Sequence, residues 1–217
     1  MGPIFSDRAQ AGAQLVPRIQ AALPPGVVPL VIALPRGGVP VAQPIAAALH
    51  APLDVVLVRK LGVPNQPELA VGAIADGQTP TLHINPDIAQ AAGLSDQDIQ
   101  ALARPALAEI ARRRALWQPG RVTRPMAGQT VVVVDDGAAT GASLRAALAW
   151  LKHQRVGRLI VALPVAPQEV VSDLAPLADR IICLATPRPF YAVGAHFADF
   201  PQVTDAEVTA ALTHDPG

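Results

Sequence analysis

Short aliphatic runs alternate with longer amphipathic segments along most of this chain. The runs at residues 27–34, 53–62, 131–134, 157–165 and 179–186 predict strands, and several consist almost entirely of buried-type residues. Helical patterns cover residues 6–23, 40–50, 95–117, 144–151 and 166–177. This alternation predicts an α/β fold, with a mainly parallel sheet flanked by helices and right-handed crossovers.

Prolines and caps refine the helix predictions. Ser6 is a candidate N-cap for the first helix, with Asp7 at its positive end. We expect Pro17 to bend or divide that helix and Pro105 to interrupt the helix at residues 95–117, since proline removes a backbone donor.

The polar residues that end the strand at residues 131–134 carry the strongest chemical signal. Asp135 and Asp136 follow four valines, and the bare segment at residues 137–143 then leads into a helix. Small residues expose main-chain N–H groups, and a helix N-terminus favours anions, so this loop is suited to a phosphate. Adjacent carboxylates would repel a phosphate, which assigns them to sugar hydroxyls or to the water shell of a magnesium ion. The chain has neither a P-loop lysine here nor a G-x-G-x-x-G dinucleotide motif.

This order of strand, Asp-Asp, small residues and Thr-Gly-x-Ser resembles the phosphoribosyl pyrophosphate (PRPP) motif of type I phosphoribosyltransferases. The resemblance implies that Asp135 and Asp136 hold the ribose hydroxyls and, through water, Mg²⁺, while residues 138–143 wrap the 5-phosphate. Gly137 stands where many family members have an aliphatic residue, and we expect it to make the start of the loop more flexible.

A second loop follows the strand at residues 27–34. Arg36, Gly37 and Gly38 resemble the family's pyrophosphate loop, and the arginine fork can bind two phosphate oxygens. The resemblance also predicts a non-proline cis peptide entering Arg36. Lys60, at the predicted end of the strand that begins at residue 53, is a further cation for pyrophosphate, with the neighbouring Arg59 less favoured.

Two irregular segments are expected to cover the site within a single domain at residues 1–217. Residues 61–85 predict a flap, a β-hairpin or both, and residues 186–205 resemble the family's C-terminal hood. Four of the seven aromatic residues lie at positions 190–200 of that segment. Phe190 and Tyr191 are candidates to stack on a planar acceptor, although the rings could equally anchor a segment with little regular structure.

The resemblance implies a phosphoribosyltransferase that uses Mg²⁺ and PRPP and joins ribose C1 to a nitrogen acceptor, such as a nucleobase or a related heterocycle of nucleotide metabolism. It extends over most of the chain to a bacterial branch of the family whose acceptor is not established. The candidate catalytic residues are Arg36, Lys60, Asp135 and Asp136. The candidate PRPP-binding residues are these four with Gly37, Gly38, Gly137, Ala138, Ala139, Thr140, Gly141, Ala142 and Ser143. A PRPP-binding regulator without turnover and, less favoured, a PRPP hydrolase are the alternatives, and Glu68 and Asp199 are weak candidates for a general base.

Composition narrows the remaining options. Seventeen Lys and Arg balance seventeen Asp and Glu, which disfavours nucleic acid as a partner, although Arg112, Arg113 and Arg114 form a basic helix end. The five histidines lack zinc-ligand spacing, and the single Cys183 is expected to be a structural thiol. The start of the chain does not resemble a signal peptide and no apolar run is long enough to span a membrane, so we expect a cytoplasmic protein; a homodimer is an open option.

Overall fold

The computed structural model describes residues 2–75, 81–117 and 124–213. Its centre is a parallel sheet of five strands in the order β2-β1-β6-β7-β8. The strands are β1 (Leu30–Ala33), β2 (Leu53–Val55), β6 (Thr130–Val134), β7 (Arg158–Val165) and β8 (Arg180–Ala185). The α/β fold with a parallel sheet is therefore confirmed.

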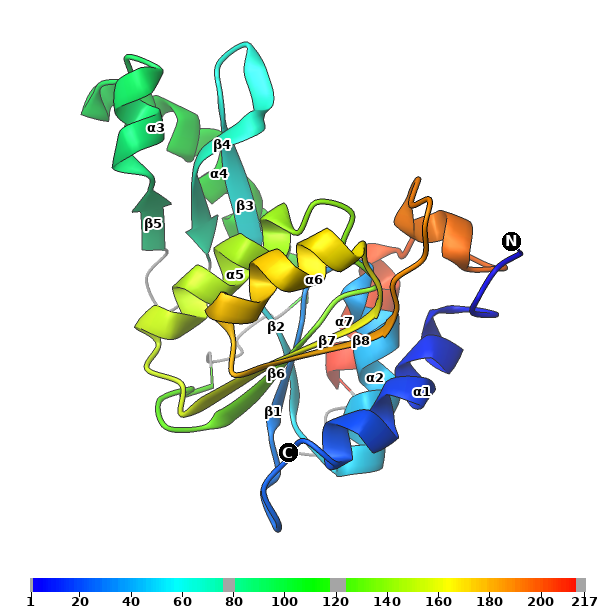
Figure 1. The fold of residues 1–217 in the computed structure, drawn as a ribbon. Helices are drawn as coiled ribbons and strands as arrows, with labels where there is room; N and C mark the ends of the chain where they lie inside the picture. Colours follow the sequence, from blue (N-terminus) through cyan, green and yellow to red (C-terminus); the bar gives the residue numbers. More distant parts are fainter. Residues whose placement is uncertain (1, 76–80, 118–123, 214–217) are drawn as a thin grey trace.

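Helices cover both faces of this sheet (Figure 1). Along β6, Val132 and Val134 belong to the core shared with α1 (Arg8–Gln20) and α2 (Gly38–Leu49). Val131 and Val133 belong to the core on the other face, with α5 (Ala142–His153) and α6 (Gln168–Leu174). The consecutive valines thus point alternately into two apolar layers, which explains why the strand carries no polar residue between them. α7 (Asp205–Thr213) lies beside α2 and α4 (Asp96–Trp117).

A smaller antiparallel sheet stands apart from the central one. It contains β3 (Val58–Val63), β4 (Gln66–Ala75) and β5 (Thr81–Ile84), followed by the short helix α3 (Pro86–Ala91). β3 contacts α4 and α5, and Figure 1 shows β4, β5 and α3 projecting beyond the main body. The predicted hairpin is confirmed, because β4 pairs with β5 in the antiparallel sense.

The single strand predicted from residue 53 to Lys60 is wrong. The parallel strand β2 ends at Val55, and β3 begins at Val58 in the other sheet. The aliphatic run continues without a break across residues 55–58, so no local signal marks where the chain changes sheets. Arg59 and Lys60 consequently lie within a flap strand and not at the end of a parallel strand.

Prolines do not divide the helices as the sequence predicted. Pro17 lies inside α1 and Pro105 inside α4, and both helices continue past them. The first helix is capped by Asp7, whose carboxylate accepts from the Gln10 N–H at 2.7 Å, and not by Ser6. Packing over the length of each helix outweighs the hydrogen bond that a proline removes.

The beginning of the described chain meets the C-terminal segment. The main-chain N–H groups of Ile4 and Phe5 both donate to the carbonyl of His196, in the short 3-10 helix Val193–His196. The Phe5 and Phe197 rings lie 5.3 Å apart between centroids, in a small core that also contains Val165. Residues 193–200 are thereby held against α1 and the end of β7.

Candidate active site

Two loops leave the carboxyl edge of the parallel sheet side by side. Ala33 of β1 is paired with Val134 of β6, and the next N–H, from Leu34, donates to the Val134 carbonyl at 2.9 Å. The chain then enters the Arg36 loop on one side and the Asp135 loop on the other. The structure thus brings together the two motifs that the sequence singled out, at an edge where parallel sheets bind ligands.

Glycines make this close approach possible. A Cβ on Gly37 would lie 2.1 Å from Asp136 Oδ2, and one on Gly38 would lie 2.6 Å from the Val134 carbonyl oxygen. The Gly38 N–H donates to the Leu34 carbonyl at 3.0 Å. Gly38 therefore serves packing of the loop, whereas Gly37 lies directly against a carboxylate of the site.

The two aspartates form a compact acidic centre. The Asp136 N–H donates to Asp135 Oδ1 at 2.9 Å, and both side chains are partly buried. Burial raises the pKa of Asp135 well above its ordinary value, and the neighbouring Asp136 raises it further. Burial also raises the pKa of Asp136, although a hydrogen bond from Arg8 acts in the opposite direction. A pair with these pKa shifts gains from a cation or from hydroxyl donors placed beside it.

The Asp135 loop continues into a cradle of small residues. A cavity of about 120 Å³ is lined by Asp135, residues 137–143 and Leu144. Ala139, Thr140 and Ser143 are exposed, and within the described chain no protein acceptor faces the N–H groups of Ala139, Thr140 and Gly141. Gly141 has a φ of 71° and is followed at once by the first turn of α5. This geometry offers main-chain donors and a helix N-terminus to an anion.

Gly137 lies in a tightly packed part of the loop, and its expected effect on loop flexibility stays a prediction. Its φ is 154°, and a Cβ there would lie 2.7 Å from Val193 Cγ1 and 2.9 Å from the Val165 carbonyl oxygen. Next to it, the Ala138 N–H donates to that same carbonyl at 3.0 Å. The glycine is required because the loop packs tightly against β7 and the C-terminal segment.

The Arg36 loop lies against the C-terminal part of the chain. The peptide bond between Pro35 and Arg36 is cis, as the resemblance predicted. Arg36 Nη1 lies 3.5 Å from Asp205 Oδ1, which also accepts from Trp117 Nε1 at 3.1 Å. A cavity of about 400 Å³ beside this loop is lined by Arg8, Arg36, Gly37, Asp136, Phe200, Pro201, Gln202 and Val203.

Arg8 is a site residue that sequence reasoning missed. Its Nε donates to Asp136 Oδ2 at 2.9 Å and its Nη1 to the Pro201 carbonyl at 2.8 Å. Asp136 lies 128 positions away in the sequence, so no spacing could reveal the pair. The one available signal was an arginine in the first turn of a helix, where a cation is unfavourable and so needs another reason to be present.

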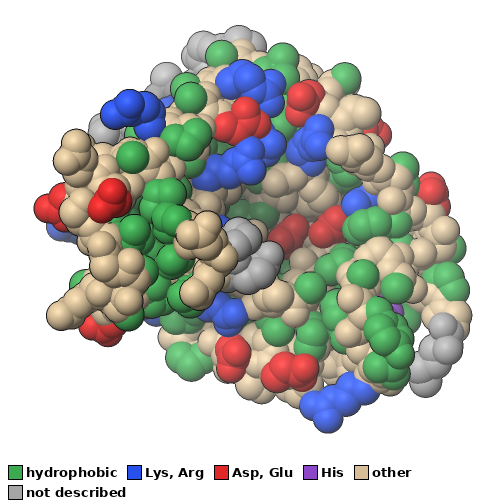
Figure 2. All heavy atoms as spheres, turned by 90° about the horizontal axis from the view of Figure 1, so that it is seen from above, with side chains coloured by type: hydrophobic (Ala, Val, Ile, Leu, Met, Phe, Trp, Pro, Cys, Tyr) green, Lys and Arg blue, Asp and Glu red, His purple; other side chains and the backbone are tan. Residues whose placement is uncertain are grey.

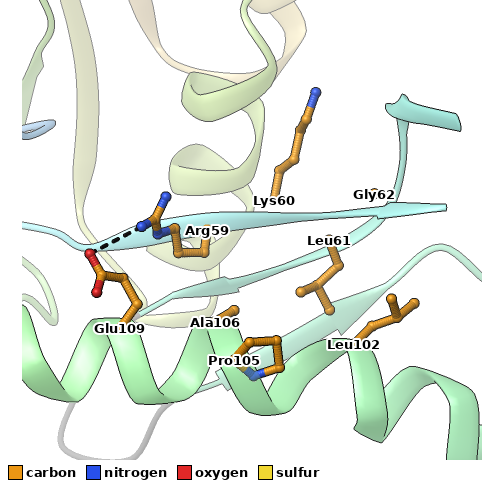
Figure 3. Close-up of a pocket in the computed structure, with 8 residues that line it drawn as sticks. All are labelled: Arg59, Lys60, Leu61, Gly62, Leu102, Pro105, Ala106 and Glu109. Carbon is orange, nitrogen blue, oxygen red and sulfur yellow. Dashed lines mark ion pairs between the residues drawn. The ribbon is translucent and has the colours of Figure 1, made fainter. Parts of the chain in front are cut away.

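Lys60 lies apart from this cavity. Figure 3 shows its side chain on the face of β3 opposite Leu61, pointing away from α4, whereas Arg59 reaches towards Glu109 at 3.3 Å. Lys60 lines a cavity of about 300 Å³ beside α4 and another of about 640 Å³ between the flap and α5. The larger cavity includes Ala142, which also lines the small cavity beside residues 137–143, so Lys60 shares a cavity with the first turn of α5 and not with the Arg36 loop.

The predicted acceptor residues lie in the C-terminal segment. The Phe190 ring packs on His196 with centroids 4.9 Å apart, while Tyr191 is 83% exposed. Neither lines the four cavities described above, and the aromatic ring that does is Phe200. The acceptor role of Phe190 and Tyr191 stays a prediction.

Figure 2 shows acidic side chains inside a hollow of the surface, with Lys and Arg around it.

Comparison with known proteins tests this interpretation. The family described as "Phosphoribosyl transferase domain" matches residues 19–175, which include both loops. The chain belongs to this family. Two curated phosphoribosyl transferases of Mycobacterium tuberculosis, so named provisionally, are each 43% identical over 209 residues. Those residues are 96% of this chain but 46% of each relative, so the chain spans less than half their length.

A solved structure has the same fold over the whole length of the chain. The crystal structure of the protein TT1426 from Thermus thermophilus is 40% identical in sequence and has a TM-score of 0.80, with 100% of each chain covered. The fold and the resemblance to type I phosphoribosyltransferases are therefore shown. In the described part of the chain, no helix is both long and apolar enough to cross a membrane.

Proposed function

We propose that this chain forms one phosphoribosyltransferase domain, with a flap at residues 61–85 and a hood at residues 186–205, that uses Mg²⁺-bound PRPP as donor. A nitrogen nucleophile, such as a nucleobase or related heterocycle, forms a bond to ribose C1. The C1–O bond to pyrophosphate breaks, and pyrophosphate leaves with the electron pair. The observation that supports this most is the contact of Gly37 with the Asp136 carboxylate, which joins the two predicted half-sites into one.

The residues around that contact have separate roles in the proposal. Within residues 138–143, the N–H groups of Ala139, Thr140 and Gly141 and the hydroxyls of Thr140 and Ser143 bind the 5-phosphate, while the Ala138 N–H stays bonded to the Val165 carbonyl. Asp135 and Asp136 accept from the ribose hydroxyls and offset the positive charge that develops on the sugar. Arg36 and the Gly37 N–H stabilise the pyrophosphate as it leaves. Lys60 is a further cation for the pyrophosphate and would approach it from the flap, on the side of the first turn of α5.

The acidic centre suits a magnesium ion that is bound jointly by the protein and by PRPP. Asp135 and Asp136 supply hard oxygen donors, and their raised pKa values mean that a nearby cation would be stabilising. The described residues contain no group of three or more His, Cys, Asp or Glu that could hold a metal ion. Water and the oxygens of PRPP would therefore complete the coordination, and Mg²⁺ would neutralise charge on the leaving group.

The test is pyrophosphate release from PRPP with Mg²⁺, measured for the protein alone and with a panel of purines, pyrimidines and other nitrogen heterocycles. Release that depends on one acceptor is expected and would identify it. The matched control is Asp135→Asn with Asp136→Asn, a double variant that should fold but lose Mg²⁺-dependent PRPP binding. Undiminished binding by that variant would remove the central assignment.

The other outcomes separate the alternatives. Release without any acceptor would mean hydrolysis of PRPP. Saturable PRPP binding without pyrophosphate release, whichever acceptor is added, would favour a PRPP-binding regulator.

Of the candidate bases, Asp199 is exposed and its N–H donates to the Ser6 carbonyl at 2.8 Å, whereas the Glu68 side chain lies outside the described part of the chain. A cytoplasmic location is part of the proposal and is checked by fractionation of cells.

A further inference from the structure

Arg8 contacts three residues from two distant parts of the molecule with one guanidinium group. One edge donates to Asp136 Oδ2 and another to the Pro201 carbonyl, at 2.9 and 2.8 Å. The face of the group lies over the Phe200 ring, 3.5 Å from its centroid. The residue is 8% exposed, although it belongs to the first turn of a helix. An N-terminal residue therefore joins the acidic centre to the C-terminal segment.

These contacts use properties that are particular to arginine. The guanidinium is planar, donates in several directions within its plane and stacks on aromatic rings, whereas a lysine ammonium is a point charge. A charge this deeply buried is tolerated only where hydrogen bonds and an opposite charge compensate it. Arg8 has both kinds of compensation. Its two hydrogen-bond partners, Asp136 and Pro201, lie far apart in the sequence.

Arg8 restrains the Asp136 carboxylate but leaves part of it accessible to a ligand. Arg8 engages Oδ2, the oxygen that also lies against Gly37, and the Asp136 side chain remains 15% exposed. Asp135 and Arg36 are the other charged groups beside this carboxylate, and Glu207 of α7 lies within electrostatic range of Arg8. Of these groups, Arg8 forms the ion pair with Asp136.

We propose that Arg8 is a positioning residue for PRPP binding. It fixes the Asp136 carboxylate against Gly37 and fastens residues 197–203 beside the same carboxylate. This role rests on the proposed function, because the ligand that Asp136 serves is the ribose of PRPP. Through Arg8, helix α1 would take part in the site, although it lies outside both the Asp-Asp motif and the Arg36 loop.

The test compares PRPP affinity, in the presence of Mg²⁺, for the wild-type protein and for Arg8→Met, Asp136→Asn and the double variant. Arg8→Met keeps a long apolar stem but removes the charge and its donors. We expect it to weaken PRPP binding about tenfold, the size of effect typical of a lost charged hydrogen bond. If Arg8 acts through Asp136, the double variant should bind PRPP within about twofold of Asp136→Asn alone.

Hydrogen exchange supplies a second measurement that does not require ligand. In Arg8→Met, amides of residues 197–203 should exchange faster than in the wild type. The matched control is Arg18→Met, which removes an exposed arginine from the same helix and should change neither PRPP affinity nor this exchange. Arg8→Lys, which retains a charge for Asp136, should recover part of the affinity and keep the protein testable if Arg8→Met does not fold.

Each failure has its own signature. Independent, multiplying losses in the double variant would show that Arg8 does not act through Asp136. Unchanged PRPP affinity and unchanged exchange in Arg8→Met, or in Arg8→Lys if only that variant folds, would overturn the positioning role while the proposed function stands. A wild-type protein that does not bind PRPP would overturn the proposed function, and the role of Arg8 with it.

Discussion

The two loops at the carboxyl edge of the sheet are built in opposite ways. The loop at residues 137–143 is open: three of its residues are exposed and its main-chain donors face a small cavity. The Arg36 loop is enclosed by distant parts of the chain: Asp205 forms an ion pair with Arg36, and the Asp136 carboxylate lies against Gly37. The first loop is held by β7 only at Gly137 and Ala138 and is open beyond them, whereas the second is in contact with distant carboxylates at both Arg36 and Gly37. Substitutions should therefore have different consequences in the two loops.

The largest effect is expected from Gly37→Ala in the enclosed loop. The new Cβ would overlap Asp136 Oδ2, so the carboxylate or the loop must move. A displacement of this kind should lower PRPP affinity about a hundredfold, measured by calorimetry with Mg²⁺. Gly2→Ala is the control, because a Cβ at Gly2 meets no atom within 4 Å. Equal affinity in wild type and Gly37→Ala would mean that this contact is not part of the site.

Arg36→Ala should have the next largest effect and should be selective. We expect PRPP and pyrophosphate to bind about tenfold more weakly, because a charged donor to the leaving group is lost, while ribose 5-phosphate binding stays nearly intact. Asp205→Asn separates the ion pair from the ligand contact, since it weakens the restraint on Arg36 but keeps the guanidinium. Equal losses for all three ligands in Arg36→Ala would contradict a pyrophosphate role.

Gly141→Ala tests the open loop through its backbone conformation. Its φ of 71° is unfavourable for a residue with a Cβ, so the free energy of unfolding should fall by about 1 to 2 kcal/mol in chemical denaturation. Gly128→Ala is a matched control, with a φ of 74° and no atom near the new Cβ. Both variants should lose stability, Gly141→Ala somewhat more because its Cβ would also lie 3.0 Å from Val170 Cγ1, but only Gly141→Ala should weaken PRPP binding. A similar loss of affinity in both would indicate a general effect of stability.

Glu109→Gln should have the smallest effect, since it acts on the attachment of the flap, outside both loops. Hydrogen bonds from Arg112 and Arg113 lower the pKa of Glu109 from its ordinary value of 4.5 to about 2, and Arg59 of β3 lies 3.3 Å away. A lowered folded-state pKa means stabilisation that is complete above about pH 4.5 and is lost as the pH falls towards 2. Because the side chain is still 26% exposed and solvent weakens its ion pairs, the melting temperature at pH 7 should fall by at most about 2 °C.

The pH dependence checks this assignment of Glu109. The difference in melting temperature between wild type and Glu109→Gln should shrink between pH 4.5 and pH 2 as the carboxylate is protonated. Glu169→Gln provides a comparison at an exposed glutamate whose arginine partner is more distant, at 3.7 Å. A constant difference over that pH range would mean that the charge of Glu109 does not stabilise the fold.

The comparison of the loops also explains what the sequence could predict. The valines before Asp135, and the glycine and alanine residues after it, carry their conformational preference locally, so strand, acidic pair and cradle were all foreseeable. The cis peptide at Arg36 came from the family resemblance. The contacts of Arg8 and Asp205 could not be predicted, because they depend on how α1 and α7 pack around the finished sheet.

The remaining errors have related physical causes. The change of sheet between Val55 and Val58 is set by pairing partners, and an unbroken aliphatic run suits either sheet. Pro17 remains inside α1, where Leu15 and Ile19 on either side of it are buried in the core. Helix packing thus compensates for a residue that local preference places elsewhere.

The bonds of Arg8 also have a consequence for the order in which the molecule assembles. They span 128 residues to Asp136 and 193 residues to Pro201, so they belong to the least local contacts of the chain. Closing such long loops costs entropy before any contact is gained, and this slows folding. We expect the parallel sheet to form first and the docking of residues 197–203 to be among the last events. During synthesis, the contact between Arg8 and Pro201 can form only after the 193 positions that separate them have been added to the chain.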